Sequence, residues 1–376
     1  MKLKPKKITM KTFNVLFSLL FISLGYSQED ISYKYAETIT SEELKSLLYE
    51  FASDNFEGRE AGKQGQKKAV EYIRDFYLKN DIQPAKGSEN YFQKMQITLP
   101  GKMVTIPYKF PDSVRGFVEK NELERLKQYL PNSTDLKNIE EYDEIINTEN
   151  VAAIIQGSMY PNEYIIVTAH LDHVGKRGDD IYNGADDDGS GSMALLEIAQ
   201  AFKLAELNGD GPKRSIVILH VTAEEKGLIG SKFYTDNPLY PLEDTITNLN
   251  VDMIGRTDPT RDSDNDNYIY LIGTDRLSSM LHETSERVNK NTINLELDYR
   301  FNAWDDPNRF YERSDHYNFA KNNIPVIFYF SGTHEDYHGP GDTPDKIRYD
   351  LLTKRTKLIF HTAWEIANMD DKIVVD

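Results

Sequence analysis

The 376-residue chain contains no cysteine, no internal repeat and only one extended apolar run. The absence of cysteine excludes disulfide bonds, so the fold depends on its core, and a chain of this length can bury a large one. Basic residues are in the minority, with 44 Lys and Arg against 61 Asp and Glu, which gives a net charge of −17. This acidity argues against nucleic acid as a partner, because a polyanion would be repelled.

The single apolar run lies near the amino terminus and is typical of a secretory signal peptide. It extends from Phe13 to Leu24, which is short for a membrane span, and lysines precede it. Gly25 and Ser27 are small residues that suit cleavage after Ser27, whereas an uncleaved anchor is the alternative. No cysteine follows for lipid attachment. We therefore expect residues 1–27 to be a signal peptide, and the mature chain to be secreted or periplasmic without a membrane attachment.

Residues 28–376 have the pattern of a single α/β domain. From residue 151 onward, apolar strands alternate with helical patterns, which predicts a mostly parallel, twisted sheet with helices on both faces. The expected strands are 151–156, 163–169, 215–221, 246–251, 268–273 and 325–330, and the expected helices are 190–207, 228–237, 276–289, 315–323 and 351–369. Residues 91–150, with strand pieces and a charged helix near 118–129, are expected to form an edge or insertion region.

Histidine and carboxylate side chains follow several of the expected strands. His170 comes directly after the strand at 163–169, and Asp172 lies two residues later. Because ligands bind at the carboxyl edge of an open α/β sheet, we expect these side chains to lie together there. The other candidates, each at a strand end or in the loop that follows, are Asp187, Glu224, Glu225, Asp252 and His338.

Each candidate also has an ordinary structural explanation. Asp187 could cap the helix that follows it, and the pair Glu224 and Glu225 could be solvated residues at a helix start. His338 could lie on the surface of a loop rich in Gly and Pro. Several independent coincidences at one sheet edge explain the pattern less well than one shared site. The remaining histidines are expected to be structural or surface residues, with a substrate contact of one of them, His316, as an alternative: His173, His220, His282, His316, His334 and His361.

Two histidines with several carboxylates and no thiolate suit Zn²⁺ bound through nitrogen and oxygen, singly or as a pair. In a pair, a bridging carboxylate and a bridging water hold the ions about 3.5–4 Å apart. The bound water is acidified, and a nearby carboxylate takes its proton. Since Zn²⁺ has no redox role, we expect hydrolysis or group transfer.

Six motifs in order resemble the co-catalytic zinc peptidases that include bacterial leucyl aminopeptidase, aminopeptidase Y and, more distantly, glutamate carboxypeptidase. The motifs are HLDHVG, NGADDDGSGSMALLE, TAEEKGLIGS, NVDMIG, SDHYNF and YHGPGDTPDKI. The resemblance covers about residues 41–90 and 150–370. It implies the zinc-peptidase architecture and an exported aminopeptidase that hydrolyses N-terminal residues from peptide substrates, using two Zn²⁺, a bridging hydroxide and a glutamate base.

The resemblance assigns a role to each candidate residue. The implied metal ligands are His170 and Asp252 for one zinc, Glu225 and His338 for the other, and Asp187 as the bridge. Glu224 would be the general base, and Asp172 would orient His170 from behind. The resemblance also implies a cis peptide bond between Asp187 and Asp188.

Three alternatives to an aminopeptidase stay open. A carboxypeptidase or dipeptidase on the same fold would need a basic pocket for the substrate carboxylate, and the candidate residues are Arg256, Arg300, Arg309 and Arg313. A glutaminyl-peptide cyclotransferase would hold a single zinc. A non-catalytic binding protein is disfavoured because all the ligands are present. Residues 262–266 resemble the start of a calcium loop, but the turn glycine and the closing glutamate are absent, so we expect a solvated acidic loop.

Overall fold

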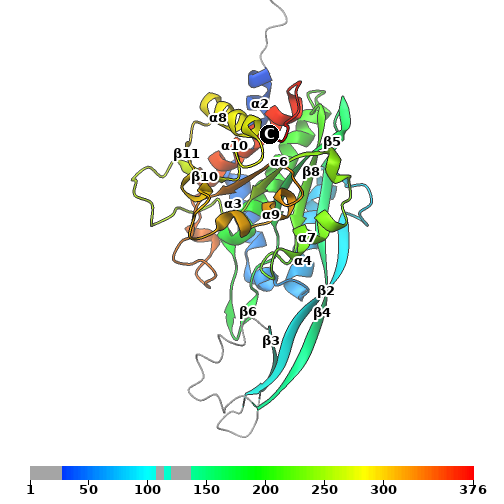
Figure 1. The fold of residues 1–376 in the computed structure, drawn as a ribbon, viewed down its shortest axis with the longest axis vertical. Coiled ribbons are helices and arrows are strands. Elements are labelled where there is room, and N and C mark those ends of the chain that lie inside the picture. Colours follow the sequence, from blue (N-terminus) through cyan, green and yellow to red (C-terminus); the bar gives the residue numbers. More distant parts are fainter. Residues whose placement is uncertain (1–27, 107–113, 120–136) are drawn as a thin grey trace, which may run out of the picture.

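The computed structural model describes residues 28–106, 114–119 and 137–376, so the expected signal peptide lies outside the described residues. Its main feature is a ten-stranded sheet (Figure 1). The strands of this sheet are β1 (Gln83–Pro84), β2 (Phe92–Ile106), β3 (Val114–Glu119), β4 (Lys137–Ile155), β5 (Tyr160–His170), β8 (Arg214–Val221), β9 (Thr245–Val251), β10 (Tyr268–Ile272), β11 (Glu296–Asp298) and β12 (Val326–Phe330). Their order is β11-β10-β12-β9-β5-β8-β4-β2-β3, and β1 pairs with β4.

The centre of the sheet consists of four parallel strands, β12, β9, β5 and β8. β8 and β9 are buried along their whole length, as expected for central strands covered on both faces. The predicted α/β class is confirmed, but the strands on either side of the centre join it in antiparallel pairs, β10 with β12 and β4 with β8. Residues 151–156 were expected to form a separate strand, and all but the last of them are the end of the 19-residue strand β4.

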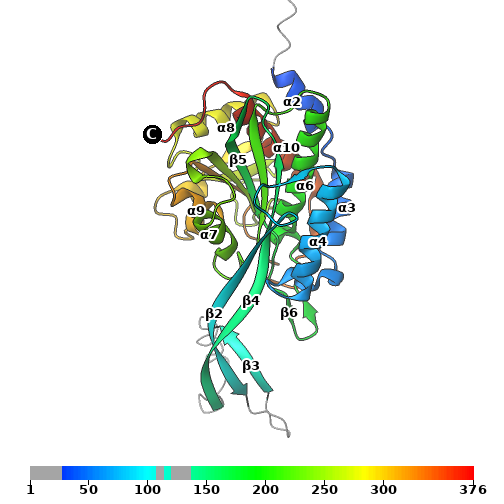
Figure 2. The ribbon, with the colours of Figure 1, turned by 90° about the vertical axis from the view of Figure 1, so that its right-hand side faces the viewer.

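Helices cover both faces of the sheet (Figure 2). They are α2 (Gln28–Ala36), α3 (Ser41–Phe51), α4 (Gln64–Lys79), α6 (Gly191–Leu207), α7 (Ile229–Asp236), α8 (Ser279–Asn291), α9 (His316–Ala320) and α10 (Tyr349–Asn368). Successive strand residues point to opposite faces, so Ile165 and Val167 pack in the larger core with α6 and α10, whereas Ile166 packs with α7 and α9. Among the described residues, no helix has the length and apolar character that a bilayer span requires.

An antiparallel arm formed by β2, β3 and β4 extends away from the body (Figures 1 and 2). Met95 and Ile146 at its base pack with Ala223, the residue immediately before Glu224 and Glu225. Val118 and Glu119, expected to begin a helix, are the end of β3, and the rest of that expected helix lies outside the described residues.

The carboxyl ends of the central strands are level with one another. His170 at the end of β5 is in register with Val221 of β8, and Thr168 is in register with Asn250 of β9. The loops that follow these strands therefore begin side by side, which brings distant parts of the chain together at one edge of the sheet.

Candidate active site

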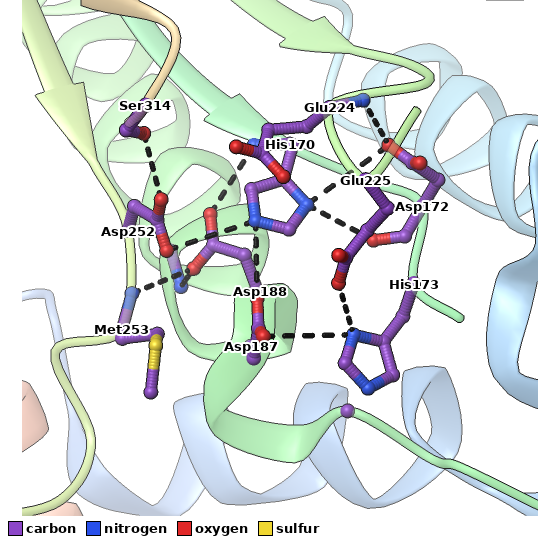
Figure 3. Close-up of polar contacts among 12 residues, drawn as sticks. His170, Asp172, His173, Asp187, Asp188, Glu224, Glu225, Asp252, Met253 and Ser314 are labelled. Atoms are coloured by element: carbon purple, nitrogen blue, oxygen red, sulfur yellow. Dashed lines mark hydrogen bonds and ion pairs between the residues drawn. The ribbon is translucent and has the colours of Figure 1, made fainter. Parts of the chain in front are cut away.

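His170, the last residue of β5, faces two carboxylates at this edge (Figure 3). Its Nε2 atom lies 3.2 Å from Oδ1 of Asp187 and 3.6 Å from Oδ1 of Asp252. Asp187 belongs to the irregular turn η4 (Ala185–Ser190) that leads into α6, and Asp252 follows β9. The ligand atoms of the three residues all lie within 4.8 Å of one another, so they can enclose a metal ion.

The second carboxylate oxygen of Asp187 faces a different group of side chains. His338 Nε2 lies 3.1 Å from Oδ2 of Asp187 and 3.1 Å from Oε2 of Glu225. Glu225 follows β8, and His338 lies in the loop after β12. All five residues predicted as ligands thus come together, with Asp187 between the two groups.

His173, expected to be a structural or surface residue, lies within the centre (Figure 3). It is fully buried, and its Nδ1 atom is 2.8 Å from Oε1 of Glu225 and 3.8 Å from Oδ2 of Asp187. These three residues form the second group able to enclose a metal ion. Gly184 allows the imidazole to lie here, since a Cβ at this position would be 2.5 Å from the ring. The signal in the sequence was a second histidine three residues after His170, in the same loop.

The other histidines occupy varied surroundings. His220 and His361 are buried and bonded to Tyr77 and Ser32, respectively, as expected of structural residues. His334, by contrast, lies beside the centre, with Nε2 3.4 Å from Oδ2 of Asp186. Burial lowers the pKa of His220 to about 3, as expected of a neutral histidine in a protein core.

Several buried polar atoms in the centre have no hydrogen-bond partner. These atoms are Oδ2 of Asp187, Oε1 of Glu225 and both ring nitrogens of His173. A buried polar group without a partner costs roughly 1–3 kcal/mol, and one cation could satisfy Oδ2 of Asp187, Oε1 of Glu225 and Nδ1 of His173 together. Imidazoles with carboxylates and no thiolate form the ligand set of a zinc site, so the residues fit zinc.

The acidic loop at residues 262–266 has different surroundings. Within the described ranges, the two groups able to enclose a metal ion both include Asp187, and neither includes this loop. Asp266 is paired with Arg348 at 3.0 Å instead.

The adjacent residues Glu224 and Glu225 have carboxyl groups with opposite properties. Burial raises the pKa of Glu224 well above its usual value. Burial and Asp187 also act to raise the pKa of Glu225, but the imidazoles of His173 and His338 lower it to about 2. A pair of carboxyl groups with pKa values pushed apart in this way is suited to two different tasks.

Asp172 contacts the centre in a way that the sequence did not indicate. His170 Nδ1 is 3.0 Å from the backbone carbonyl oxygen of Asp172, whereas the Asp172 carboxylate is 3.9 Å away. That carboxylate instead accepts a hydrogen bond from the backbone N–H of Glu224 at 3.1 Å. Burial raises the pKa of Asp172 to about 6. The backbone of Asp172 therefore orients His170, and its side chain fixes the loop that carries Glu224.

Two further side chains hold the ligands in place. Asp188, joined to Asp187 by the expected cis peptide bond, accepts hydrogen bonds from three backbone N–H groups, those of His170, Gly191 and Met253. It thereby connects β5, α6 and the loop after β9. Ser314 donates a hydrogen bond of 2.7 Å to Oδ2 of Asp252. Sequence reasoning missed Ser314, although it opens the SDHYNF motif.

A pocket lined by aromatic residues opens beside the centre. Its lining includes Phe310, Phe328, Phe330 and Tyr337, together with His170, Asp187, Glu224, Asp252 and His338. His316 is fully buried and stacks on Phe328 from outside this lining, with ring centroids 4.7 Å apart. The aromatic rings thus place an apolar surface directly next to the histidines and carboxylates.

Only one of the four arginines proposed for a substrate carboxylate lines this pocket. Arg313 does so, and its guanidinium lies 4.9 Å from the centre of the Phe310 ring. Arg256 is paired with Asp336, and Arg309 with Glu312. Arg300 contacts Thr260.

The sequence of residues 150–363 matches the profile of Peptidase family M28. Leucine aminopeptidase 2 from Trichophyton equinum is 29% identical over 252 residues, which are 58% of this chain and 45% of that protein. Aminopeptidase NAALADL1 from Rattus norvegicus is 38% identical over 112 residues, which are 29% of this chain and 14% of that protein. The matches therefore span less than half the length of these relatives.

Solved structures with the same fold include an aminopeptidase from Aneurinibacillus sp. strain AM-1, with a TM-score of 0.63 and 16% identity over 92% of this chain and 98% of that chain. The zinc aminopeptidase BSAP from Bacillus subtilis has a TM-score of 0.64 and 15% identity over 89% and 96%. A glutaminyl cyclase from Porphyromonas gingivalis has a TM-score of 0.56 and 14% identity over 86% and 98%. At these identities the likeness concerns the fold.

Proposed function

Because the chain belongs to Peptidase family M28, we propose that it is an exported aminopeptidase that uses two zinc ions to remove N-terminal residues from peptides. The observation that carries the proposal is the pair Glu224 and Glu225 at the sheet edge. Glu225 lies 2.8 Å from His173 and 3.1 Å from His338 among the candidate ligands, whereas Glu224 lines the pocket beside them. This combination suits a proton acceptor next to a metal ligand.

The proposed ligands follow the two groups of side chains. His170 and Asp252 would hold one zinc, Glu225 and His338 the other, and Asp187 would serve both. Zinc ions bound there would polarise the carbonyl of the scissile peptide bond and lower the pKa of a water molecule.

Glu224 is proposed as the general base. Its carboxylate takes the proton of the attacking water and delivers it to the leaving amine. Burial raises its pKa above the usual value of a glutamate, which suits a group that must both accept and release a proton. Asp172 keeps Glu224 in position through the hydrogen bond to its backbone N–H.

The pocket and the charge of the centre support an aminopeptidase. Phe310, Phe328 and Phe330 offer an apolar surface for the first side chain of the substrate. The carboxylate of Glu224, which is outside the proposed ligand set, lines the same pocket and would attract a positively charged amino terminus. One observation favours a carboxypeptidase or dipeptidase instead, namely that Arg313 also lines this pocket and could bind a substrate carboxylate.

A substrate panel tests the proposal. The purified protein, loaded with zinc, is assayed on aminoacyl p-nitroanilides, their N-acetylated counterparts, N-blocked dipeptides with a free carboxylate, and a peptide with N-terminal glutamine. We expect the enzyme to cleave only the substrates that have a free amino group. We also expect it to bind two zinc equivalents per chain. Cleavage of the N-blocked dipeptides would indicate the carboxypeptidase. Cyclisation of the glutaminyl peptide with one zinc equivalent would indicate the cyclotransferase.

Export is proposed from the sequence of residues 1–27. Expression of the full chain in a bacterial host, followed by fractionation and amino-terminal sequencing, tests it. We expect the mature protein outside the cytoplasm to begin at Gln28. A full-length protein retained in the membrane fraction would indicate an uncleaved anchor.

A further inference from the structure

Arg59 is a charged residue without exposed surface next to the candidate metal centre. Its guanidinium donates hydrogen bonds to backbone carbonyl oxygens from all three of its nitrogens. Nε donates to Leu171 at 2.9 Å, and Nη2 to Gly184 at 2.8 Å. Nη1 donates to Asn183 at 2.6 Å and to Phe51 at 3.2 Å. The rigid, planar guanidinium can satisfy these separate acceptors at once.

Three of these acceptors lie at the two ends of one loop, and the fourth, Phe51, ends α3. Leu171 directly follows His170, and Asn183 and Gly184 come shortly before Asp187. Between them the loop carries the buried residues Asp172 and His173, followed by a short hairpin of β6 (Lys176–Arg177) and β7 (Asp180–Ile181). Arg59 therefore joins the start and the end of the segment that separates two of the proposed ligands.

The backbone around Arg59 is shaped to meet the same loop. Gly58 has a φ of +68°, and a Cβ there would lie 2.4 Å from the carbonyl oxygen of Gly175, so only glycine permits the approach. Gly175 in turn donates its N–H to the carbonyl oxygen of Gly58 at 3.0 Å. On the same short helix, η2 (Asp54–Arg59), Asp54 accepts a hydrogen bond from the Asn183 side chain at 2.8 Å.

The charge of Arg59 is balanced by the acidic centre. Burial lowers its pKa to about 10, while the nearby carboxylates of Asp342 and Asp187 act to raise it. Arg59 therefore keeps its charge at neutral pH. A buried charge is costly unless it is compensated, so a buried arginine at this position is expected to have a specific role.

We propose that Arg59 is a positioning residue for the metal centre, which fixes His170 relative to Asp187 by closing the loop between them. The proposal rests on the proposed function, in which these two side chains bind zinc. The alternative is that Arg59 only stabilises the fold. Arg214 provides a matched control for that alternative, because it is also buried and donates to the carbonyl oxygens of Ile366 and Met369. It begins β8, at the opposite end of the strand from Glu224.

The test compares Arg59→Lys with Arg214→Lys in the full chain. Lysine keeps the charge but presents a single ammonium group, which cannot reproduce the fork of the guanidinium. Zinc affinity is measured by competition with a chelator, and the unfolding temperature is measured in the absence of metal. We expect both variants to unfold at lower temperature. We expect Arg59→Lys alone to lose about 10–100-fold in zinc affinity, as for other residues that orient metal ligands.

Equal zinc affinity in the two variants would overturn the proposal. If Arg59→Lys does not fold, Asp54→Ala decides the question, because Asp54 is exposed and holds the same end of the loop through Asn183. A several-fold loss of zinc affinity at unchanged unfolding temperature then supports the proposal, and unchanged affinity overturns it. The wild-type protein separates the two hypotheses: if it binds no zinc, the proposed function fails, whatever the variants do.

Discussion

The carboxylate of Asp172 accepts a hydrogen bond of 3.1 Å from the backbone N–H of Glu224, and this bond joins the loop after β5 to the loop after β8. Asp172 is fully buried, so the bond is protected from competing water. The proposed base is thereby held against the loop that carries His170. Changes at Asp172 are accordingly expected to affect proton transfer more than metal binding.

Asp172→Ala should lower kcat while two zinc ions stay bound. The contact with His170 survives because the backbone carbonyl oxygen of residue 172 makes it. Asp172→Asn should restore part of the lost kcat, since its amide oxygen can still accept from Glu224. Zinc analysis and steady-state kinetics of both variants check this. Loss of zinc from Asp172→Ala would contradict it and indicate that the carboxylate orients His170 directly.

Glu224→Gln and Glu225→Ala should have different effects. Glutamine at position 224 keeps the shape of the side chain but cannot accept the proton, so kcat should fall by roughly 10²–10⁴-fold with both zinc ions retained. Glu225→Ala removes a proposed ligand and should lose metal first. Zinc content and kcat of the two variants decide the matter. If Glu224→Gln lost metal and Glu225→Ala kept it, the two roles would have to be exchanged. Full activity of both variants would mean that the site is misplaced.

His173→Gln should weaken zinc binding, because His173 Nδ1 lies 2.8 Å from Oε1 of Glu225. We expect a loss of about 10–100-fold in affinity, the range for residues that contact or orient metal ligands. His361→Gln is the control, since His361 is also buried but contacts Ser32. Chelator competition with both variants provides the measurement. Equal zinc affinities of the two variants would mean that His173 has a purely structural role.

Zinc binding should release protons and weaken as the pH falls. Burial acts to lower the pKa of His338, but in the metal-free protein Asp187 and Glu225 raise it to about 10, so the imidazole is protonated at pH 7. It must lose this proton to bind zinc, so affinity should rise with pH up to about 10. Titration with zinc in weakly buffered solution at pH 7 should acidify the sample. His338→Ala should release fewer protons, and an equal release would contradict the assignment.

The parts of the site that sequence could predict are those set by local pattern and side-chain chemistry. His170 ends β5 and Asp252 follows β9, so the sheet itself brings them together. Ser314 contacts Asp252 from 62 residues away, and such a contact depends on how a distant loop packs. The position of His173 depends on the space that Gly184 leaves for its ring. The pairing of β2 with β4 has a register that the weak apolar pattern of these strands does not specify.

Asp187 turns one oxygen towards His170 and the other towards His338. Because a single carboxylate serves both positions, filling one position changes the charge that the other offers to a second ion. The two stepwise binding constants should therefore differ, and loading should proceed through a species with one ion per chain. Such a species would allow a different divalent metal to be added in the second step, so that each position could be given its own spectroscopic label.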